Sequence, residues 1–386
     1  MEIDFVAWIG LALRWLHLIT GIAWIGSSFY FVWLDNSLKD SELWAVHGGG
    51  FYHKKKYLVA PDHMPEDLHW FKWEAYFTWI SGFLLLSLVY YYGAGLNLID
   101  HAKMYLDPGE AVLLGLAFIA GGWIFYDSLC KTDIGKNNRL FGCIWFLALT
   151  GAAYALNQIF SGRGAYIHVG AMIGTVMVAN VFFVIIPNQK KVVAALLAGK
   201  KPDPRLGAQA KQRSLHNNYM TLPVLLIMIS NHYPMLFGHP YNWLILAGLS
   251  AASWFIRQFF NLKHKGDVNY WYPAIGSVLF VLVMLFSSGV FNGTAGAVSG
   301  EKVSAAEVRS LIRTHCSACH SDTPTHTGMA EAPLGVMFDT MEQIKKHAPR
   351  IKARAVEIKD MPLGNEKNMT EEERRKLGAG LDQLPR

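Results

Sequence analysis

Cys316, Cys319 and His320 lie in the sequence Cys-Ser-Ala-Cys-His, the pattern in this chain with the most specific chemistry. Two cysteines at this spacing lie on one turn and can form thioethers to the two vinyl groups of a porphyrin. The adjacent histidine is then held beneath the ring as an axial iron ligand. We therefore predict a covalent haem c. A redox dithiol would not need the histidine, and a zinc site would need a second ligand pair, which Cys130 and Cys143 cannot supply from another domain.

The sixth ligand of such an iron is usually Met or His, and Met361 is the best candidate downstream. It is followed by Pro362 and a short loop that ends at Met369, the next candidate. Because methionine ligation raises the reduction potential, we expect this part of the chain to accept electrons and pass them on rather than bind oxygen.

Two helix-start signals place these residues in a small domain. Ser304 with Glu307, and Thr370 with Glu373, have the spacing of a capping box. Residues 304–386 therefore read as a helix, the Cys-x-x-Cys-His turn, a loop, a middle helix, the Met-Pro loop and a terminal helix, an order similar to a class I cytochrome c. Residues 292–303 are expected to form a flexible linker before this domain.

Residues 1–291 contain nearly every long apolar run of the chain. A transmembrane helix needs about 20 mostly apolar residues. Eight ranges meet this requirement: 5–34, 73–92, 109–128, 140–160, 165–187, 215–236, 241–260 and 271–291. We therefore predict an all-α protein, in which residues 1–291 form a polytopic membrane bundle of about eight transmembrane helices in the lipid bilayer, followed by the cytochrome c domain.

Lys and Arg are distributed unevenly among the loops. The loops 35–71, 129–139, 188–214 and 261–270 hold sixteen of them, whereas the loops near 93–108, 161–164 and 237–240 hold only Lys103 and Arg163. Basic loops stay in the cytoplasm, so both termini and the haem domain are expected in the periplasm, outside a bacterial inner membrane. Attachment of c-type haem is expected on that side as well. The formal charge of +6 is explained by these loops and not by nucleic-acid binding.

Three histidines within the apolar ranges are candidate ligands for a second cofactor, a haem b inside the bundle. Titratable side chains are costly in lipid and are therefore functional candidates. His17 lies near the midplane, whereas His168 and His232 lie near the outer ends of their helices and match each other in depth. The alternative for each histidine is a hydrogen bond to a neighbouring helix.

A second polar group lies toward the cytoplasmic ends of the predicted helices. It comprises Lys72, Glu74, Asp127, His216, Asn217 and Asn218. The alternatives are hydrogen bonds between helices for Glu74 and the two asparagines, and for Lys72 an ammonium that reaches the membrane surface.

Three segments resemble the family of membrane-bound cytochrome c urate oxidases (urate hydroxylases): Arg14–Gly26, Leu68–Tyr76, and His216–Tyr219 with Leu222-Pro223. In that family an eight-span domain is fused to a C-terminal cytochrome c. The resemblance implies oxidation of urate to 5-hydroxyisourate. Electrons would then pass through haem c to a soluble cytochrome c or a terminal oxidase, and not directly to oxygen.

A urate site should offer a cation, amide partners, an aromatic face and a base. Lys72, Glu74, Asp127, His216, Asn217 and Asn218 supply such groups, so we predict the catalytic site in the cytoplasmic half of the bundle. Electrons would then need a relay cofactor to cross about 30 Å of hydrocarbon. If urate binds instead at the outer end, near Asn157, Arg163, His168 and His232, haem c can accept its electrons directly.

Two other functions fit the same features. The chain could be a quinol-oxidising subunit that delivers electrons to its own cytochrome c, or a membrane anchor that docks the cytochrome against a terminal oxidase. Many polar groups at depth argue against a simple anchor. The Gly48–Gly50 run shows no strand before it and does not resemble a phosphate-binding loop.

Overall fold

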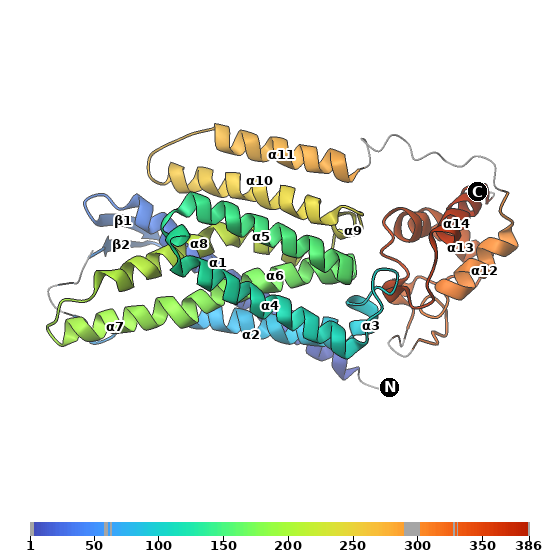
Figure 1. Ribbon diagram of the computed structural model, residues 1–386, viewed down its shortest axis with the longest axis horizontal. Helices are drawn as coiled ribbons and strands as arrows, with labels where there is room; N and C mark the ends of the chain where they lie inside the picture. The colour runs from blue at the N-terminus through green and yellow to red at the C-terminus, as the bar shows by residue number, and fades with distance from the viewer. Residues whose placement is uncertain are drawn as a thin grey trace.

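The computed structural model describes residues 4–57, 61, 64–288, 302–326, 329 and 331–384. It has two parts, a long bundle of helices and a smaller helical C-terminal unit at one end of that bundle (Figure 1). The chain is mostly helical, as predicted. Most of the predicted linker, residues 292–301, lies outside the described residues.

The bundle has a helix at each of the eight predicted ranges. In chain order these are α1 (Phe5–Ser37), α2 (Trp73–Leu86) with η1 (Ser87–Tyr92), α4 (Pro108–Lys131), α5 (Asn138–Ile159), α6 (Gly162–Ala179) with η3 (Asn180–Ile185) and α7 (Ile186–Leu197), α8 (Pro204–Ser230), α10 (Asn242–Lys263) and α11 (Trp271–Ser287). Short α3 (Ala94–Asn97) and α9 (Pro234–Phe237) lie at the end that faces the C-terminal unit (Figure 1).

Six of these helical segments are long and apolar enough to cross a membrane. Large apolar side chains on the outside of the bundle are exposed, including Trp15 (68%), Leu113 (70%) and Leu147 (66%). In water such a surface would be costly, so it is compatible with a lipid environment. Helix α11 is shorter and α8 is less apolar, so the number of eight spans stays a prediction.

The helix ends follow local capping chemistry. Helix α4 begins after a capping box of Asp107 and Glu110, with Pro108 in the first turn. Helix α8 begins earlier than predicted because Asp203 caps it and Pro204 occupies its first position.

One element was not predicted, a two-stranded hairpin at the far end of the bundle. Strands β1 (Glu42–His47) and β2 (Gly50–Lys55) pair antiparallel, with His47 opposite Gly50. Gly48 and Gly49 join them with φ of 59° and 81°, values that glycine adopts at little cost. The glycine run therefore does follow a strand, which corrects the sequence interpretation.

Among its described residues the C-terminal unit has the α-helices α12 (Ala305–His315), α13 (Met341–Ile351), which continues as η5 (Lys352–Glu357), and α14 (Glu371–Gln383), with short η4 (Pro333–Gly335) and η6 (Leu363–Asn365). Both predicted capping boxes are present, at Ser304 with Glu307 and at Thr370 with Glu373. The unit has its own core, in which Val308, Ile344 and Leu377 are fully buried.

The C-terminal unit contacts the bundle through glycines. A Cβ on Gly364 would lie 2.1 Å from the carbonyl oxygen of Gly95, and a Cβ on Gly238 would lie 2.2 Å from Cγ2 of Ile358. Both approaches leave no room for a side chain. The loop that follows Met361 therefore lies directly against α3, and Ile358, which precedes Met361, lies against the end of α9.

Candidate functional site

The Cys-x-x-Cys-His segment forms a tight turn after α12. The amide of Cys316 donates to the carbonyl of Ile312 at 2.8 Å, and that of His320 to the carbonyl of Cys316 at 2.9 Å. Both cysteines are free thiols. The Nδ1 of His320 lies 2.9 Å from the carbonyl oxygen of Val336, which fixes Nδ1 as the donor and leaves Nε2 as a ligand.

The loop with Met361 is fixed by a buried arginine. Arg374 is 5% exposed, and its Nη1 donates to the carbonyls of Ala355 and, at 2.7 Å, of Met361. Met361 and Cys316 both pack at the edge of the C-terminal core, whereas Met369 lies inside it.

These residues fit a covalent haem c. Two free thiols stand on one turn, the histidine orientation is set by a carbonyl, and burial lowers the pKa of His320, which favours the neutral imidazole that binds iron. Among the described residues there is no group of three or more His, Cys, Asp or Glu that could hold a metal ion. The covalent haem and the choice of Met361 as sixth ligand stay predictions.

The three histidines proposed for a bundle haem have separate surroundings. The Nδ1 of His17 lies 3.0 Å from the carbonyl of Thr78 on α2, and His232 is exposed. His168 is fully buried, with Nδ1 2.8 Å from the carbonyl of Gly164. A Cβ on Gly115 would lie 2.4 Å from its Nε2, so the backbone of α4 occupies the place of an iron. This arrangement does not fit a haem b held by these histidines.

A buried polar cluster lies in the half of the bundle toward the hairpin, between α4, α8, α10 and η3. Its members are Tyr126, Asp127, Asn180, Arg213, His216, Asn217, Asn218, Arg257 and Asn261. The hydroxyl of Tyr126 lies 2.8 Å from Nδ1 of His216 and accepts from Nδ2 of Asn180 at 3.0 Å. The same Nδ2 donates to Oδ1 of Asn217 at 2.8 Å. Three of the predicted catalytic residues (Asp127, His216, Asn217) therefore lie together, and Asn218, the next residue of α8, donates instead to Oδ1 of Asn261 at 3.1 Å.

The two arginines of this cluster differ in their partners. Nη2 of Arg213 donates to Oδ1 of Asp127 at 2.7 Å. Arg257 is 5% exposed, and its Nε donates to Oδ1 of Asn218 at 2.5 Å while its guanidinium lies 4.2 Å from the centre of the Phe29 ring. Within the described ranges no carboxylate pairs with Arg257.

Several polar atoms of the cluster lack a hydrogen-bond partner among the described residues. They are Oδ1 of Asn180, Nη1 of Arg213, Nε2 of His216, Nη2 of Arg257 and Nδ2 of Asn261. Buried polar atoms are normally paired, so water or a small polar ligand is needed at this place.

Lys72 and Glu74 are not joined to that cluster by any interaction between described residues. The ammonium of Lys72 lies 5.2 Å from the centre of the Trp73 ring, and Glu74 lies in the first turn of α2. A carboxylate stabilises that end of a helix, which gives Glu74 a structural role. Its catalytic role stays a prediction.

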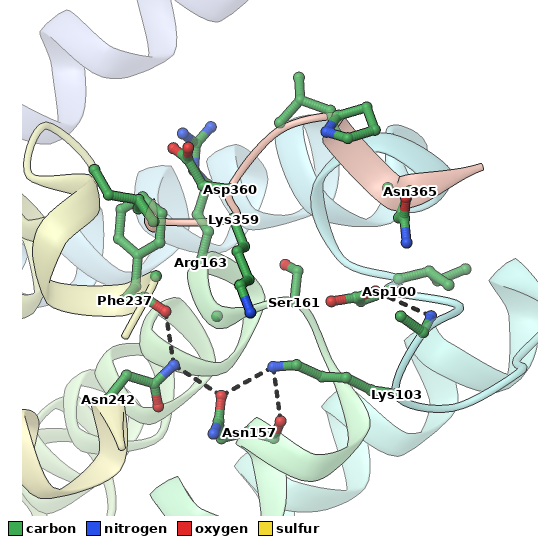
Figure 2. Close-up of a pocket in the computed structure, with 18 of the residues that line it drawn as sticks. Asp100, Lys103, Asn157, Ser161, Arg163, Phe237, Asn242, Lys359, Asp360 and Asn365 are labelled. Carbon is green, nitrogen blue, oxygen red and sulfur yellow. Dashed lines mark hydrogen bonds between the residues drawn. The ribbon is translucent and has the colours of Figure 1, made fainter. Parts of the chain in front are cut away.

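A cavity of about 520 Å³ lies between the end of the bundle and the C-terminal unit; we call it the interface cavity (Figure 2). The bundle side comes from the loop after α3, the end of α5 and the start of α6, with Asp100, Lys103, Asn157 and Arg163. The other side comes from residues 358–374, which include the loop after Met361.

The polar side chains of the interface cavity form a short network at its base. Nζ of Lys103 donates to the backbone and side-chain oxygens of Asn157, at 2.8 and 3.0 Å, and to the carbonyl of Phe160. Nδ2 of Asn242 donates to the same Oδ1 at 2.7 Å. In Figure 2 the ammonium groups of Lys103 and Lys359 point toward one space, with Ser161 beside it.

Asn157 and Arg163, predicted for the alternative outer site, both line this cavity, and so do Lys103, Asp100 and Asn242, which were not predicted for it. The missed signal was the loop charge: Lys103 and Arg163 are the two basic residues of the three sparsely charged loops, and both line this cavity. His168 and His232, named for the same alternative, do not line it.

One family matches the chain. The model described as urate oxidase N-terminal matches residues 4–288, which is the whole described bundle. No curated protein and no solved structure matches.

Proposed function

The chain belongs to the urate oxidase N-terminal family, and from this premise we propose that it is a membrane-bound oxidoreductase that oxidises urate to 5-hydroxyisourate. Urate and one water give 5-hydroxyisourate, two electrons and two protons. The electrons leave through the haem c of the C-terminal unit to a soluble cytochrome c or a terminal oxidase of the respiratory chain.

The C-terminal unit lies outside the matched residues, so its role is argued from its own side chains. Cys316 and Cys319 would hold the haem covalently, and His320 and Met361 would bind its iron. When bound, the haem supplies a centre that accepts one electron at a time. Contacts with Arg374 and Val336 hold the Met361 backbone and the His320 ring in place.

The observation that carries the proposal is the contact between the two parts. A haem domain that serves only as a carrier needs no close contact with the bundle. At Gly364 and Gly238, however, the C-terminal unit and the bundle approach each other so closely that a Cβ would not fit. The touching segment is the loop next to Met361. Electrons released at this end of the bundle therefore have a short route to the C-terminal unit. We place that unit in the periplasm because Lys and Arg are concentrated in the loops at the opposite end of the bundle.

An anaerobic titration tests the function. Oxidised, purified protein is mixed with urate while the haem spectrum is followed. Because urate gives two electrons and the haem takes one, about half an equivalent of urate should reduce all of the haem. Reduction by a quinol but not by urate would favour the quinol-oxidising alternative, and no reduction by either would leave the bundle as an anchor.

The buried polar cluster is one candidate position for urate. Arg257 has no described carboxylate partner and several neighbouring polar atoms lack partners, as expected around a polar anion. This position keeps the predicted residues Asp127, His216, Asn217 and Asn218 in the catalytic site. It also requires an electron relay through the bundle, and the three histidines do not fit one.

A further inference from the structure

We infer that the interface cavity is the urate-binding site, and that Lys103 and Arg163 bind the anion beside the loop that follows Met361. The inference rests on the proposed function and adds the position of the substrate. The cavity, about 520 Å³, lies within the usual range for small-molecule sites and has room for a purine with water.

The first argument is the placement of positive charge. Loops that leave the cytoplasm contain few Lys and Arg, because basic residues there oppose correct insertion. The three sparsely charged loops of this chain hold only Lys103 and Arg163. They are distant in sequence, yet both line one cavity. Two basic residues in loops that normally contain few, both at one cavity, indicate that their positive charge has a function.

The second argument is that neither cation has an anionic partner. Within the described ranges, Lys103 and Arg163 form no salt bridge with a carboxylate. The ammonium of Lys103 is held by three neutral oxygens of Asn157 and Phe160, although its stem is exposed. Arg163 lies 5.3 Å from the centre of the Phe237 ring. Burial of the ammonium lowers the pKa of Lys103, a cost that a bound anion would remove.

The wall that the C-terminal unit contributes is different, because most of its charged side chains pair with one another. Lys359 pairs with Glu371 at 2.6 Å, Asp360 pairs with Arg354, and Arg374 donates to backbone carbonyls. These groups build the wall and hold the loop after Met361. Lys359 therefore has its carboxylate partner within this wall, whereas Lys103 and Arg163 on the bundle side have none among the described residues.

The remaining groups suit the edges of a purine. Helix α6 begins at Gly162, and the positive end of its dipole adds to the potential, although the Ser161 hydroxyl already accepts from the amide of Gly164 at 3.0 Å. Gln158 lines the cavity and offers an amide for carbonyl and N–H edges. Asn157 lines it as well, but its Oδ1 already accepts from Lys103 and Asn242, so only its Nδ2 is offered to a carbonyl. Asp100 supplies an acceptor for a substrate N–H.

The position also removes the need for a relay. Urate in the interface cavity would touch the C-terminal unit itself, because Pro362, Asn365 and Met369 line the same space. Urate in the buried polar cluster would be separated from that unit by much of the bundle. Since the described histidines do not fit a bundle haem, direct transfer at the interface is the simpler route.

Equilibrium binding of radiolabelled urate to the full-length protein, with the haem kept reduced so that no turnover occurs, tests the inference. Lys103→Met and Arg163→Gln should each weaken urate binding by about tenfold to a hundredfold, the range for a lost charge-assisted contact. Lys346→Met removes an exposed lysine outside the cavity and should change nothing. Retained affinity in both cavity variants would overturn the inference.

Two further outcomes separate this inference from the proposed function. If Arg257→Gln abolishes binding and the cavity variants do not, urate binds in the buried polar cluster; the function then stands and this position is wrong. If the unaltered protein binds no urate, the proposed function fails. A reactive lysine label read by mass spectrometry needs no variant: urate should protect Lys103 and leave Lys346 labelled, and equal labelling of Lys103 with and without urate would contradict the inference.

Discussion

The buried polar cluster and the interface cavity contain the same kinds of side chain but in different states. In the cluster, Asp127 neutralises Arg213, and Tyr126, Asn180 and Asn217 bond to one another. In the cavity, Lys103 is held by neutral oxygens of Asn157 and Phe160, and neither Lys103 nor Arg163 has a described carboxylate partner. A cation paired with a carboxylate contributes to stability and to specificity of packing, whereas a cation among neutral groups keeps a net charge that an anionic ligand can neutralise. Arg257 of the cluster shares this second property, so the two regions are compared by experiment below.

This difference suggests two roles for polar residues at depth. The cluster joins α4, α8, α10 and η3 where lipid offers no hydrogen bonds. The cavity lies where the two parts meet and where water can enter. Each prediction below changes one of the two regions and asks whether the other responds.

The largest effect is expected from Asp127→Asn. It leaves the Arg213 guanidinium, only 5% exposed, without its anion, which should lower the free energy of unfolding by about 3–5 kcal/mol. Thermal unfolding of the purified protein measures this. Asp133→Asn is the matched control, because Asp133 pairs with Lys136 on the surface and surface pairs contribute about 1 kcal/mol or less. A folded Asp127→Asn protein that cannot bind urate would assign the substrate to the cluster.

The next effect is expected from Gly238→Val, which acts at the contact. The valine side chain would collide with Ile358, so the C-terminal unit could not dock in the same position against the bundle. Misplacement of reacting groups by about 1 Å can cost a hundredfold, and we expect at least that loss in the rate of urate-dependent haem reduction, measured by stopped flow.

Gly95→Ala is the control for that variant. A Cβ there meets only Oε1 of Glu366, at 4.0 Å, so the rate should be retained. An unchanged rate in Gly238→Val would show that the contact between Gly238 and Ile358 is not needed for electron transfer.

A smaller effect separates Arg163 from Arg257, neither of which has a carboxylate partner among the described residues. Arg163→Gln should raise the KM for urate by about tenfold, because it removes a cation from the cavity. Arg257→Gln should leave the KM within about twofold, since in our assignment Arg257 bonds to Asn218 and not to substrate. Steady-state kinetics with an artificial electron acceptor gives both values, and the reverse pattern would exchange the roles of the two regions.

The smallest effect concerns pH. Burial lowers the pKa of Lys103, and Asp100 opposes the shift. Lys103 is charged below that pKa and neutral above it, so urate affinity should be constant near neutral pH. It should then fall as pH rises, before an ordinary lysine would titrate.

Binding measured across alkaline pH checks this. Arg163 and Asp100 on the bundle side, and Lys359, Glu371 and Arg374 on the other, face the same space, and Lys103→Arg leaves all of them in place. That variant should move the loss of affinity to higher pH, because guanidinium stays protonated. The same profile in both proteins would exclude Lys103 as the titrating group.

Much of the fold was predictable because its signals are local. Apolar length marked the eight helical ranges, and Ser304 with Glu307 marked the start of α12. The capping box of Thr340 with Gln343, which starts α13, was present in the sequence and was overlooked. The hairpin was missed because its strands are short and charged, and only the Gly48-Gly49 turn indicated it.

The candidate sites were less predictable because they join distant segments. The neighbours His216, Asn217 and Asn218 pointed to one polar region, and the structure places Asn180 against Asn217, and Arg257 and Asn261 against Asn218, from other helices. The interface cavity joins three loops of the bundle to residues 358–374. No spacing in the chain encodes that contact, although the unusual positions of Lys103 and Arg163 were visible.

The continuous rod from α6 through η3 to α7 has a practical consequence. It runs for 36 residues, Gly162–Leu197, about 54 Å at 1.5 Å per residue, and so extends well past a hydrocarbon layer of about 30 Å. Its far end is braced against α8 by Nδ2 of Asn188, which donates to Oε1 of Gln209 at 3.0 Å. The turn at Gly199, which joins α7 to α8, is therefore a suitable insertion site. A rigid fusion partner placed there would enlarge the particle for electron cryomicroscopy and leave the buried polar cluster and the interface cavity unchanged.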